Sequence, residues 1–361
     1  MSTLRKDPVS DGWVIIAEER AARPMDFAPE TPVRRTGGSC PFCEGHEHQT
    51  PPEIVAFRRA GSGPNMPGWS VRAIPNKFAA LHIEGNLDRR GEGIYDLMNG
   101  IGAHEVIVET PDHDGHMVQY GREKVEEILR MYLVRCRDLF QDKRFRYIQI
   151  FRNYGPVAGA SLAHPHSQLI ALPISPRWVK EELHSSQAYW RLKERCLFCD
   201  IVRQELEDRS RVVFENSRYV SIEPFASKFP FETWLFPKEH EPDFAQTAEE
   251  EIGDLAEVLQ QTLLAISRCL NDPPWNYLIH SAPRLTELDL RVGEATVEAD
   301  YHWHIEIFPR LTRMAGFEWG TGFYINPMVP ETAAAELRKV LEPREAREES
   351  CGASASTGSD I

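Results

Sequence analysis

Two histidines, His164 and His166, stand one residue apart in the stretch NYGPVAGASLAHPHSQLIALP at residues 153–173. In a β-strand, side chains at positions i and i+2 point to the same face, so both imidazoles are expected on one side of a sheet. A neutral imidazole is a common metal ligand, and near neutral pH it is also a nucleophile and a leaving group. Such a pair could therefore supply one metal ligand and one histidine for group transfer, and if His164 binds a metal, His166 is free for chemistry.

Four of the seven cysteines form two Cys-x-x-Cys pairs, a spacing typical of tetrahedral zinc sites. Each pair is followed by a lone histidine and then by a His-x-His motif, in the same order in both halves of the chain. This repetition predicts two zinc ions per chain. The expected ligands are Cys40, Cys43, His113 and His164 for the first ion, and Cys196, Cys199, His240 and His302 for the second.

Three alternatives to these ligand sets remain open in the sequence. His46 and His48 follow Cys43 closely enough to replace His113. The cysteine pairs could instead be buried or redox-active thiols without a metal. A different second site, suited to iron or zinc, would combine carboxylate with imidazole ligands. Its candidate members are Glu182, His280, His302 and His304.

The elements that must position these residues recur along the chain. The order is Cys-x-x-Cys, lone histidine, helix, Asn-Tyr strand and His-x-His strand, first in residues 40–172 and again in residues 196–309. Apolar residues follow a helical period in 125–140 and in 252–270. The repeat predicts an α+β fold made of a duplicated unit, in which each half has an antiparallel sheet and a packed helix.

The repeat also suggests where the units begin and end. A long bridge, SPRWVKEELHSSQAYWRLKER, joins the two copies, and a tail of small polar residues follows the second copy. Such a tail is expected to be disordered. The expected division is residues 1–175, 176–342 and 343–361 for the first unit, the second unit and the tail.

The composition restricts the classes of partner. The 361 residues are 42% hydrophobic and 27% charged, which is ordinary for a soluble globular protein. A net charge of −14 argues against a general nucleic-acid binder. No stretch approaches the ~20 apolar residues of a membrane span, and the N-terminus lacks the apolar core of a signal peptide. We therefore expect a cytoplasmic protein that binds neither nucleic acid nor membrane.

The glycine-rich loop before the two histidines is suited to a phosphate group. Asn153 and Ser161 supply an amide and a hydroxyl, and the loop glycines allow close approach to the backbone. Arg20 and Arg23 could supply positive charge. A glycine-rich loop alone is more often a turn, so this signal depends on the neighbouring His166.

Taken together, these motifs resemble the galactose-1-phosphate uridylyltransferase family of the histidine triad superfamily, over roughly residues 4–310. The resemblance is carried by RKDPVSDGWVIIAEERAARP, the first cysteine pair, NKFAAL, PDH and HPHSQ. It implies that His166 is the nucleophile that takes a nucleoside monophosphate and that Gln168 holds the phosphate. It further implies a homodimer and a set of substrate-binding residues: Arg20, Arg23, Asn76, Phe78, Asn153 and Ser161.

The implied reaction is a two-step transfer from a nucleoside diphosphate sugar to a sugar 1-phosphate or to phosphate. Histidine triad hydrolases have a third histidine where this chain has Gln168, and an amide cannot act as an acid or base. Transfer is therefore favoured over hydrolysis. The family default is uridylyl transfer to a hexose 1-phosphate in galactose metabolism.

Two alternatives to this default remain. HPHSQ and GTGFYIN resemble the branch that includes ADP-glucose phosphorylases, in which an adenylyl group passes to inorganic phosphate. Ala160 and Ser167 also stand where the family often has other residues. An alternative of another class is a non-catalytic, zinc-stabilised nucleotide binder.

Overall fold

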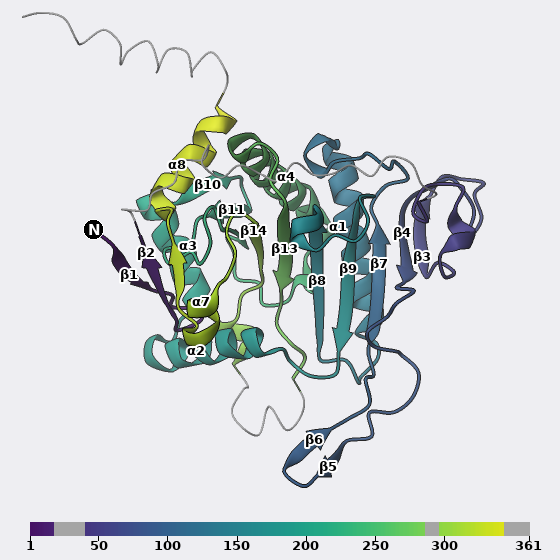
Figure 1. The fold of residues 1–361 in the computed structure, drawn as a ribbon, viewed down its shortest axis with the longest axis horizontal. Helices are drawn as coiled ribbons and strands as arrows, with labels where there is room; N and C mark the ends of the chain where they lie inside the picture. Colours follow the sequence, from purple (N-terminus) through teal and green to yellow (C-terminus); the bar gives the residue numbers. More distant parts are fainter. Residues whose placement is uncertain (18–39, 286–295, 343–361) are drawn as a thin grey trace, which may run out of the picture.

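The computed structural model describes residues 1–17, 40–285 and 296–342, and its main feature within them is a ten-stranded sheet (Figure 1). The strands of this sheet are β3 (Val55–Arg58), β4 (Trp69–Pro75), β7 (Ala103–Val108), β8 (Tyr147–Tyr154), β9 (His166–Leu172), β10 (Val212–Glu215), β11 (Tyr219–Ile222), β12 (Thr233–Pro237), β13 (Trp275–His280) and β14 (His304–Pro309). Every neighbouring pair is antiparallel.

The strand order confirms the duplicated α+β fold. Across the sheet the order is β10-β11-β12-β14-β13-β8-β9-β7-β4-β3, which is symmetric about the β13–β8 junction. The repeat did not predict that the sheets of the two halves are continuous: Trp275–Ile279 pairs with Ile150–Tyr154. This pairing satisfies the backbone groups of two strands that would otherwise be sheet edges.

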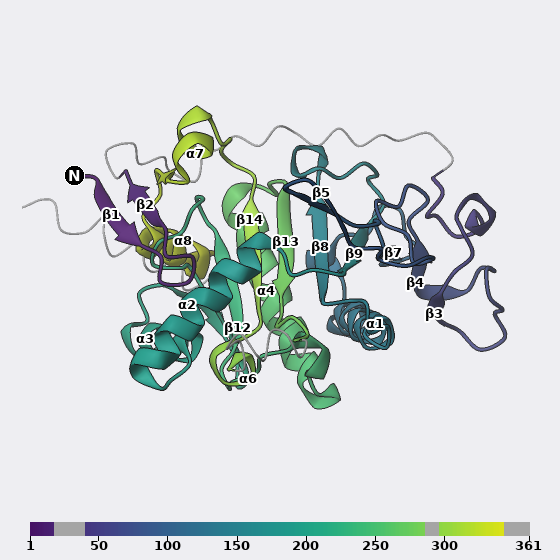
Figure 2. The ribbon, with the colours of Figure 1, turned by 90° about the horizontal axis from the view of Figure 1, so that it is seen from below.

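Two long helices cover one face of the sheet, one from each half. They are α1 (Arg122–Leu139) and α4 (Ile252–Leu270), which lie together below the sheet in Figure 2. Their apolar residues at helical spacing are buried and form one core cluster with the sheet. Asn271 ends α4 in the left-handed conformation, with φ 56°, a position at which asparagine is tolerated. Both helices match the ranges expected from periodicity.

The remaining elements surround this core. They are the strands β1 (Thr3–Lys6), β2 (Trp13–Ile16), β5 (Arg90–Glu92), β6 (Tyr95–Leu97) and β15 (Tyr324–Asn326), with the helices α2 (Arg177–Lys193), α3 (Leu197–Asp208), α6 (Val297–Asp300), α7 (Gly316–Thr321) and α8 (Pro330–Leu341). The bridge between the repeats thus forms α2. Among the described residues, no helix is long and apolar enough to cross a membrane.

The N-terminal strands belong spatially with the second half of the chain. β1 pairs with β2, and β2 pairs in parallel with β15. Arg5 of β1 donates two hydrogen bonds to Glu331 of α8, at 2.8 and 3.0 Å. The first 16 residues therefore pack against β15 and α8, which lie in the second expected unit. A pair of short strands is stable only with a third strand or a helix, and β15 supplies the third strand. The boundary at 175 stays a prediction, and the tail 343–361 lies outside the described residues.

Alternation along a strand determines which side chains point toward the helices and which point to the other face of the sheet. Ser167 of β9 points into the core, where it accepts a 2.8 Å hydrogen bond from the Tyr132 hydroxyl of α1. His166 and Gln168 therefore point to the other face of the sheet. In the second half, His304 and Glu306 of β14 occupy the equivalent positions.

Candidate active site

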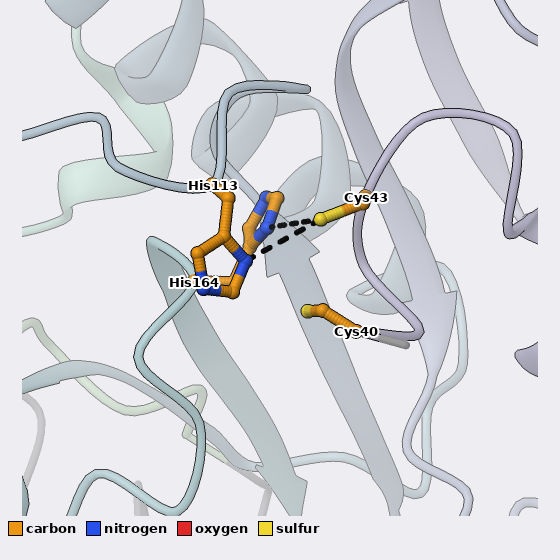
Figure 3. A group of neighbouring side chains, drawn as sticks. All are labelled: Cys40, Cys43, His113 and His164. Carbon is orange, nitrogen blue, oxygen red and sulfur yellow. Dashed lines mark hydrogen bonds between the residues drawn. The ribbon is translucent and has the colours of Figure 1, made fainter. Parts of the chain in front are cut away.

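The first cysteine pair and two histidines from distant parts of the sequence converge on one point (Figure 3). Cys40 and Cys43 lie on a turn before β3, His113 follows β7, and His164 precedes β9. One ligand atom from each lies within 4.8 Å of the others, and Cys43 Sγ is 3.3 Å from His113 Nδ1 and 3.6 Å from His164 Nδ1. The structure thus brings together the four ligands predicted for the first site.

A hydrogen bond next to this group fixes which nitrogen of His164 is available to a metal cation. His164 Nε2 donates to the Thr110 carbonyl at 2.8 Å, so its Nδ1 carries the lone pair that faces the cysteines. In the protein alone, burial and the neighbouring Cys40 thiol raise the pKa of Cys43 to about 11. A bound cation would reverse this and favour the thiolate. Two thiolates and two neutral imidazoles fit tetrahedral zinc.

The second half repeats the arrangement. Cys199 Sγ lies 3.3 Å from His240 Nδ1 and 3.5 Å from His302 Nδ1, and Cys196 completes a group within 4.8 Å. The distal nitrogens again donate to backbone carbonyls: His302 Nε2 to Pro237 at 3.1 Å and His240 Nε2 to Glu298 at 2.9 Å. The second predicted ligand set is therefore also brought together.

The structure also shows where the residues of two alternative ligand sets lie. His46 is not a member of the first group, and its Nδ1 lies 2.8 Å from the Cys40 carbonyl oxygen. The carboxylate and imidazole set is a separate, third group on the sheet face of the second half. It contains Glu306 in place of His302, so its members are Glu182, His280, His304 and Glu306.

A buried ion pair lies at the centre of this third group. Glu182 accepts hydrogen bonds from His280 Nδ1 at 2.7 Å and from the Tyr301 hydroxyl at 2.6 Å. Burial favours the neutral form of both charged partners, but their mutual attraction outweighs it. The pKa of Glu182 is therefore held below its usual range, and the pKa of His280 is raised above its usual range.

Glu182→Gln is expected to lower the free energy of unfolding by about 3–5 kcal/mol, because it leaves the buried His280 without its partner. The lowered pKa of Glu182 contributes stability that is lost as the pH falls. The raised pKa of His280 contributes stability that is lost as the pH rises. The deficit should therefore be largest between about pH 4.3 and 6.5, the two unfolded-state values.

The measurement is denaturant unfolding of the variant at several pH values. Glu181→Gln, which removes the partner of the exposed Arg177, is the matched control and should cost less than about 1 kcal/mol. Equal, pH-independent losses in the two variants would contradict the ion-pair account.

His166 is held as a neutral imidazole, and among the described residues only its Nδ1 has a hydrogen-bond partner. Its Nδ1 donates to the His164 carbonyl at 2.8 Å, so the lone pair is on Nε2. The side chain is buried, and burial lowers its pKa, which favours the neutral form. The Phe42 ring, between the two cysteines of the first pair, lies edge-on at 5.4 Å between ring centroids. This arrangement leaves the lone pair of Nε2 unprotonated.

Gln168 lies two residues further along the same face of β9, in a network with β7 and the turn that follows β4. Its Oε1 is 2.9 Å from His104 Nε2 and 3.4 Å from Asn76 Nδ2. Asn76 was predicted at the site, whereas His104 was missed. The sequence shows only that His104 is in phase with Val106 and Val108 of an expected strand, and the β7–β9 pairing that brings it to Gln168 is seen in the structure.

Asn153 of β8 is oriented by the second half of the chain. Asn276 of β13 donates to Asn153 Oδ1 at 2.8 Å and lies 2.7 Å from the carbonyl oxygen of Ala158 in the glycine-rich loop. Because Oδ1 is the acceptor in this contact, the Asn153 Nδ2 group is the donor that remains for the site face. Asn276 was missed, although the repeated Asn-Tyr strand contains it, because nothing in the sequence showed that β8 and β13 are neighbours.

The other residues predicted to bind substrate are exposed or lie outside the described residues. Ser161 is exposed in the loop before His164. The Phe78 side chain is 84% exposed, and its backbone N–H donates to Asn76 Oδ1 at 2.9 Å. Arg20 and Arg23 lie outside the described residues.

The sequence is similar to known families and proteins over most of its length. Residues 1–176 match the family model described as galactose-1-phosphate uridyl transferase, N-terminal domain, and residues 115–355 match a domain of unknown function (DUF4921). ADP-glucose phosphorylase of Arabidopsis thaliana is 37% identical over 93% of this chain and 92% of that protein. Galactose-1-phosphate uridylyltransferase of Thermotoga maritima is 28% identical over 94% of this chain and 98% of that protein.

Solved structures of the same two kinds of enzyme also match the fold of this chain. The crystal structure of the Arabidopsis thaliana ADP-glucose phosphorylase with bound ADP-glucose matches with a TM-score of 0.77 and 35% identity, covering 94% of this chain and 99% of that one. A uridylyltransferase structure matches with a TM-score of 0.71 and 29% identity, covering 94% and 98%. The chain therefore belongs to the galactose-1-phosphate uridylyltransferase family and is a nucleotidyltransferase.

Proposed function

We propose that the protein transfers an adenylyl group from an ADP-sugar to inorganic phosphate, with His166 as the covalent carrier. The observation that carries the proposal is the neutral His166, whose Nδ1 is bonded to the His164 carbonyl and whose Nε2 therefore carries the lone pair. Gln168 and Asn153 lie on the same sheet face with amide groups that can donate to phosphate oxygens.

The reaction would proceed in two displacements at one phosphorus atom. His166 Nε2 attacks the α-phosphorus of the ADP-sugar, a P–N bond forms, and the bond to the leaving sugar 1-phosphate breaks. An oxygen of inorganic phosphate then attacks the adenylyl-histidine, which releases ADP and restores neutral His166. Both the leaving group and the acceptor are phosphates that are already anionic, so neither step needs a strong acid or base.

The sequence analysis predicted uridylyl transfer, with adenylyl transfer as the alternative. The comparisons support adenylyl transfer more strongly than uridylyl transfer. The ADP-glucose phosphorylase relative is 37% identical and the uridylyltransferase relative 28%, each over almost the whole chain. The resemblance of GTGFYIN to the ADP-glucose phosphorylase branch agrees with this choice. The non-catalytic alternative has less support, because these relatives are enzymes.

A pair of steady-state assays tests this function. We expect the protein to convert ADP-glucose and phosphate into ADP and glucose 1-phosphate. Uridylyl transfer between UDP-glucose and galactose 1-phosphate should be slower by at least about tenfold in kcat/KM, a difference of ~1.4 kcal/mol in transition-state binding. Faster uridylyl transfer would restore the family default and contradict the adenylyl proposal.

We further propose that each chain binds two zinc ions with structural roles and forms a homodimer. The zinc proposal is supported by the two Cys/His groups, whose distal imidazole nitrogens are fixed by backbone carbonyls. Zinc would hold the loop that ends at His164 against the first cysteine pair. His166, two residues on, would thereby be kept in place.

Gln168→His is expected to shorten the lifetime of the adenylyl-enzyme in the absence of phosphate. An imidazole can take a proton from water, which the amide cannot do, so hydrolysis should rise relative to transfer by about 10²-fold or more. The measurement is single-turnover decay of labelled adenylyl-enzyme. Equal decay rates in two folded proteins would show that water is excluded by shape and not by this side chain.

A further inference from the structure

The imidazole of His104 lies between a backbone donor and the side chain of Gln168. Its Nδ1 is 3.2 Å from the backbone nitrogen of Ala80, which can only donate a hydrogen bond. Nδ1 must therefore be the acceptor, and a neutral His104 carries its proton on Nε2. The tautomer of this histidine is thus set by the main chain of the turn that follows β4.

The protonated Nε2 of His104 then fixes the orientation of the Gln168 amide. Nε2 is 2.9 Å from Gln168 Oε1, and because Nε2 donates, the atom facing it must be the oxygen. Asn76 Nδ2 lies 3.0 Å from His104 Nε2 and 3.4 Å from Gln168 Oε1. Because Nδ2 and the protonated Nε2 are both donors, they cannot bond to each other, and Gln168 Oε1 is the acceptor that both of them face. The Asn76 amide is itself oriented, because its Oδ1 accepts the Phe78 N–H at 2.9 Å. Two groups anchored to the main chain therefore engage one oxygen.

We propose that His104 is a positioning residue that keeps the NH₂ group of Gln168 turned toward the phosphoryl group held by His166. This inference rests on the proposed function, because it assigns a direction to the amide at that site. In the opposite orientation the amide oxygen would face the phosphoryl oxygens and repel them. By fixing the donor beforehand, His104 removes the cost of turning the amide during the reaction.

The test is a double-mutant cycle between His104 and Gln168, with the single-turnover rate of adenylyl-enzyme formation from ADP-glucose as the readout. His104→Phe keeps a planar ring and removes both hydrogen bonds, and it should slow the step by about 10- to 100-fold. The same change in a Gln168→Ala background should have no further effect, since the residue through which His104 acts is absent. His104→Gln should recover most of the rate, because its amide can donate to Gln168 in place of the imidazole.

His184→Phe is the matched control, because His184 is an exposed histidine on α2, and it should keep the wild-type rate. A wild-type rate in His104→Phe would overturn the proposal. A full penalty of His104→Phe in the Gln168→Ala background would also overturn it, since His104 would then act independently of Gln168. If His104→Phe does not fold, His104→Ala replaces it in the same cycle. A wild-type protein that forms no adenylyl-enzyme would instead refute the proposed function.

Discussion

His166→Ala is expected to lower the rate of nucleotidyl transfer by at least ~10⁴-fold, because the group that forms the covalent bond is removed. The fold should be retained. His166 is the first residue of β9, its Nδ1 bond is to a carbonyl only two residues away, and its ring lies on the face away from the helical core. The measurement is kcat/KM for ADP-glucose phosphorolysis, with circular dichroism and the melting temperature to establish folding.

The second repeat supplies the control for this prediction. His304 occupies the equivalent position in β14, but its ring packs between Phe198 and Trp234, and Glu306 stands where the first repeat has Gln168. We interpret it as a structural residue. His304→Ala should therefore retain activity per folded molecule. Activity that survives in His166→Ala and is lost in folded His304→Ala would show that the nucleophile is in the second half.

Loss of either metal is expected to cause the largest change in stability. Elemental analysis should find about two zinc ions per chain, and one in Cys40→Ser or Cys196→Ser. Structural zinc contributes roughly 10 kcal/mol or more of binding energy to the folded state, so each variant should melt at least about 10 °C lower. Cys40→Ser should also reduce transfer, because its group includes His164, two residues before the proposed nucleophile His166.

Cys269→Ser is the matched control, since Cys269 lies on α4 outside all three groups of potential ligands. It should keep both metal ions and most of its stability. A protein that contains no metal after purification, or that loses metal equally in all three cysteine variants, would contradict the zinc assignment.

The candidate metal ligands were predictable because the motif occurs twice. A single Cys-x-x-Cys pair leaves its histidine partners undetermined, whereas a lone histidine after each pair pointed to His113 and His240. His46 stayed an alternative to His113 in the sequence, and it is absent from the group that the structure brings together. The long helices were predictable for a similar local reason, since apolar spacing shows directly which face is buried.

The features that the sequence did not reveal depend on which strands are neighbours. The β8–β13 pairing brings Asn276 to Asn153, and the β7–β9 pairing brings His104 to Gln168. Strand pairing is non-local, and no property of the individual strands specifies the partner. His302 and His304, although two residues apart, belong to different groups because the strand begins between them. His302 precedes β14 and faces the cysteines, whereas His304 begins the strand and faces Glu182 and His280.

Trapping of the covalent intermediate tests the central claim most directly. The protein would be incubated without phosphate with ADP-glucose, or separately with UDP-glucose, each labelled in the α-phosphate, and the label retained by denatured protein would be counted. We predict that ADP-glucose labels the wild-type protein, that added phosphate discharges the label as ADP, and that His166→Ala stays unlabelled. The account would be contradicted if ADP-glucose left the wild-type protein unlabelled, if UDP-glucose labelled it more readily, or if folded His166→Ala were labelled as strongly as the wild type.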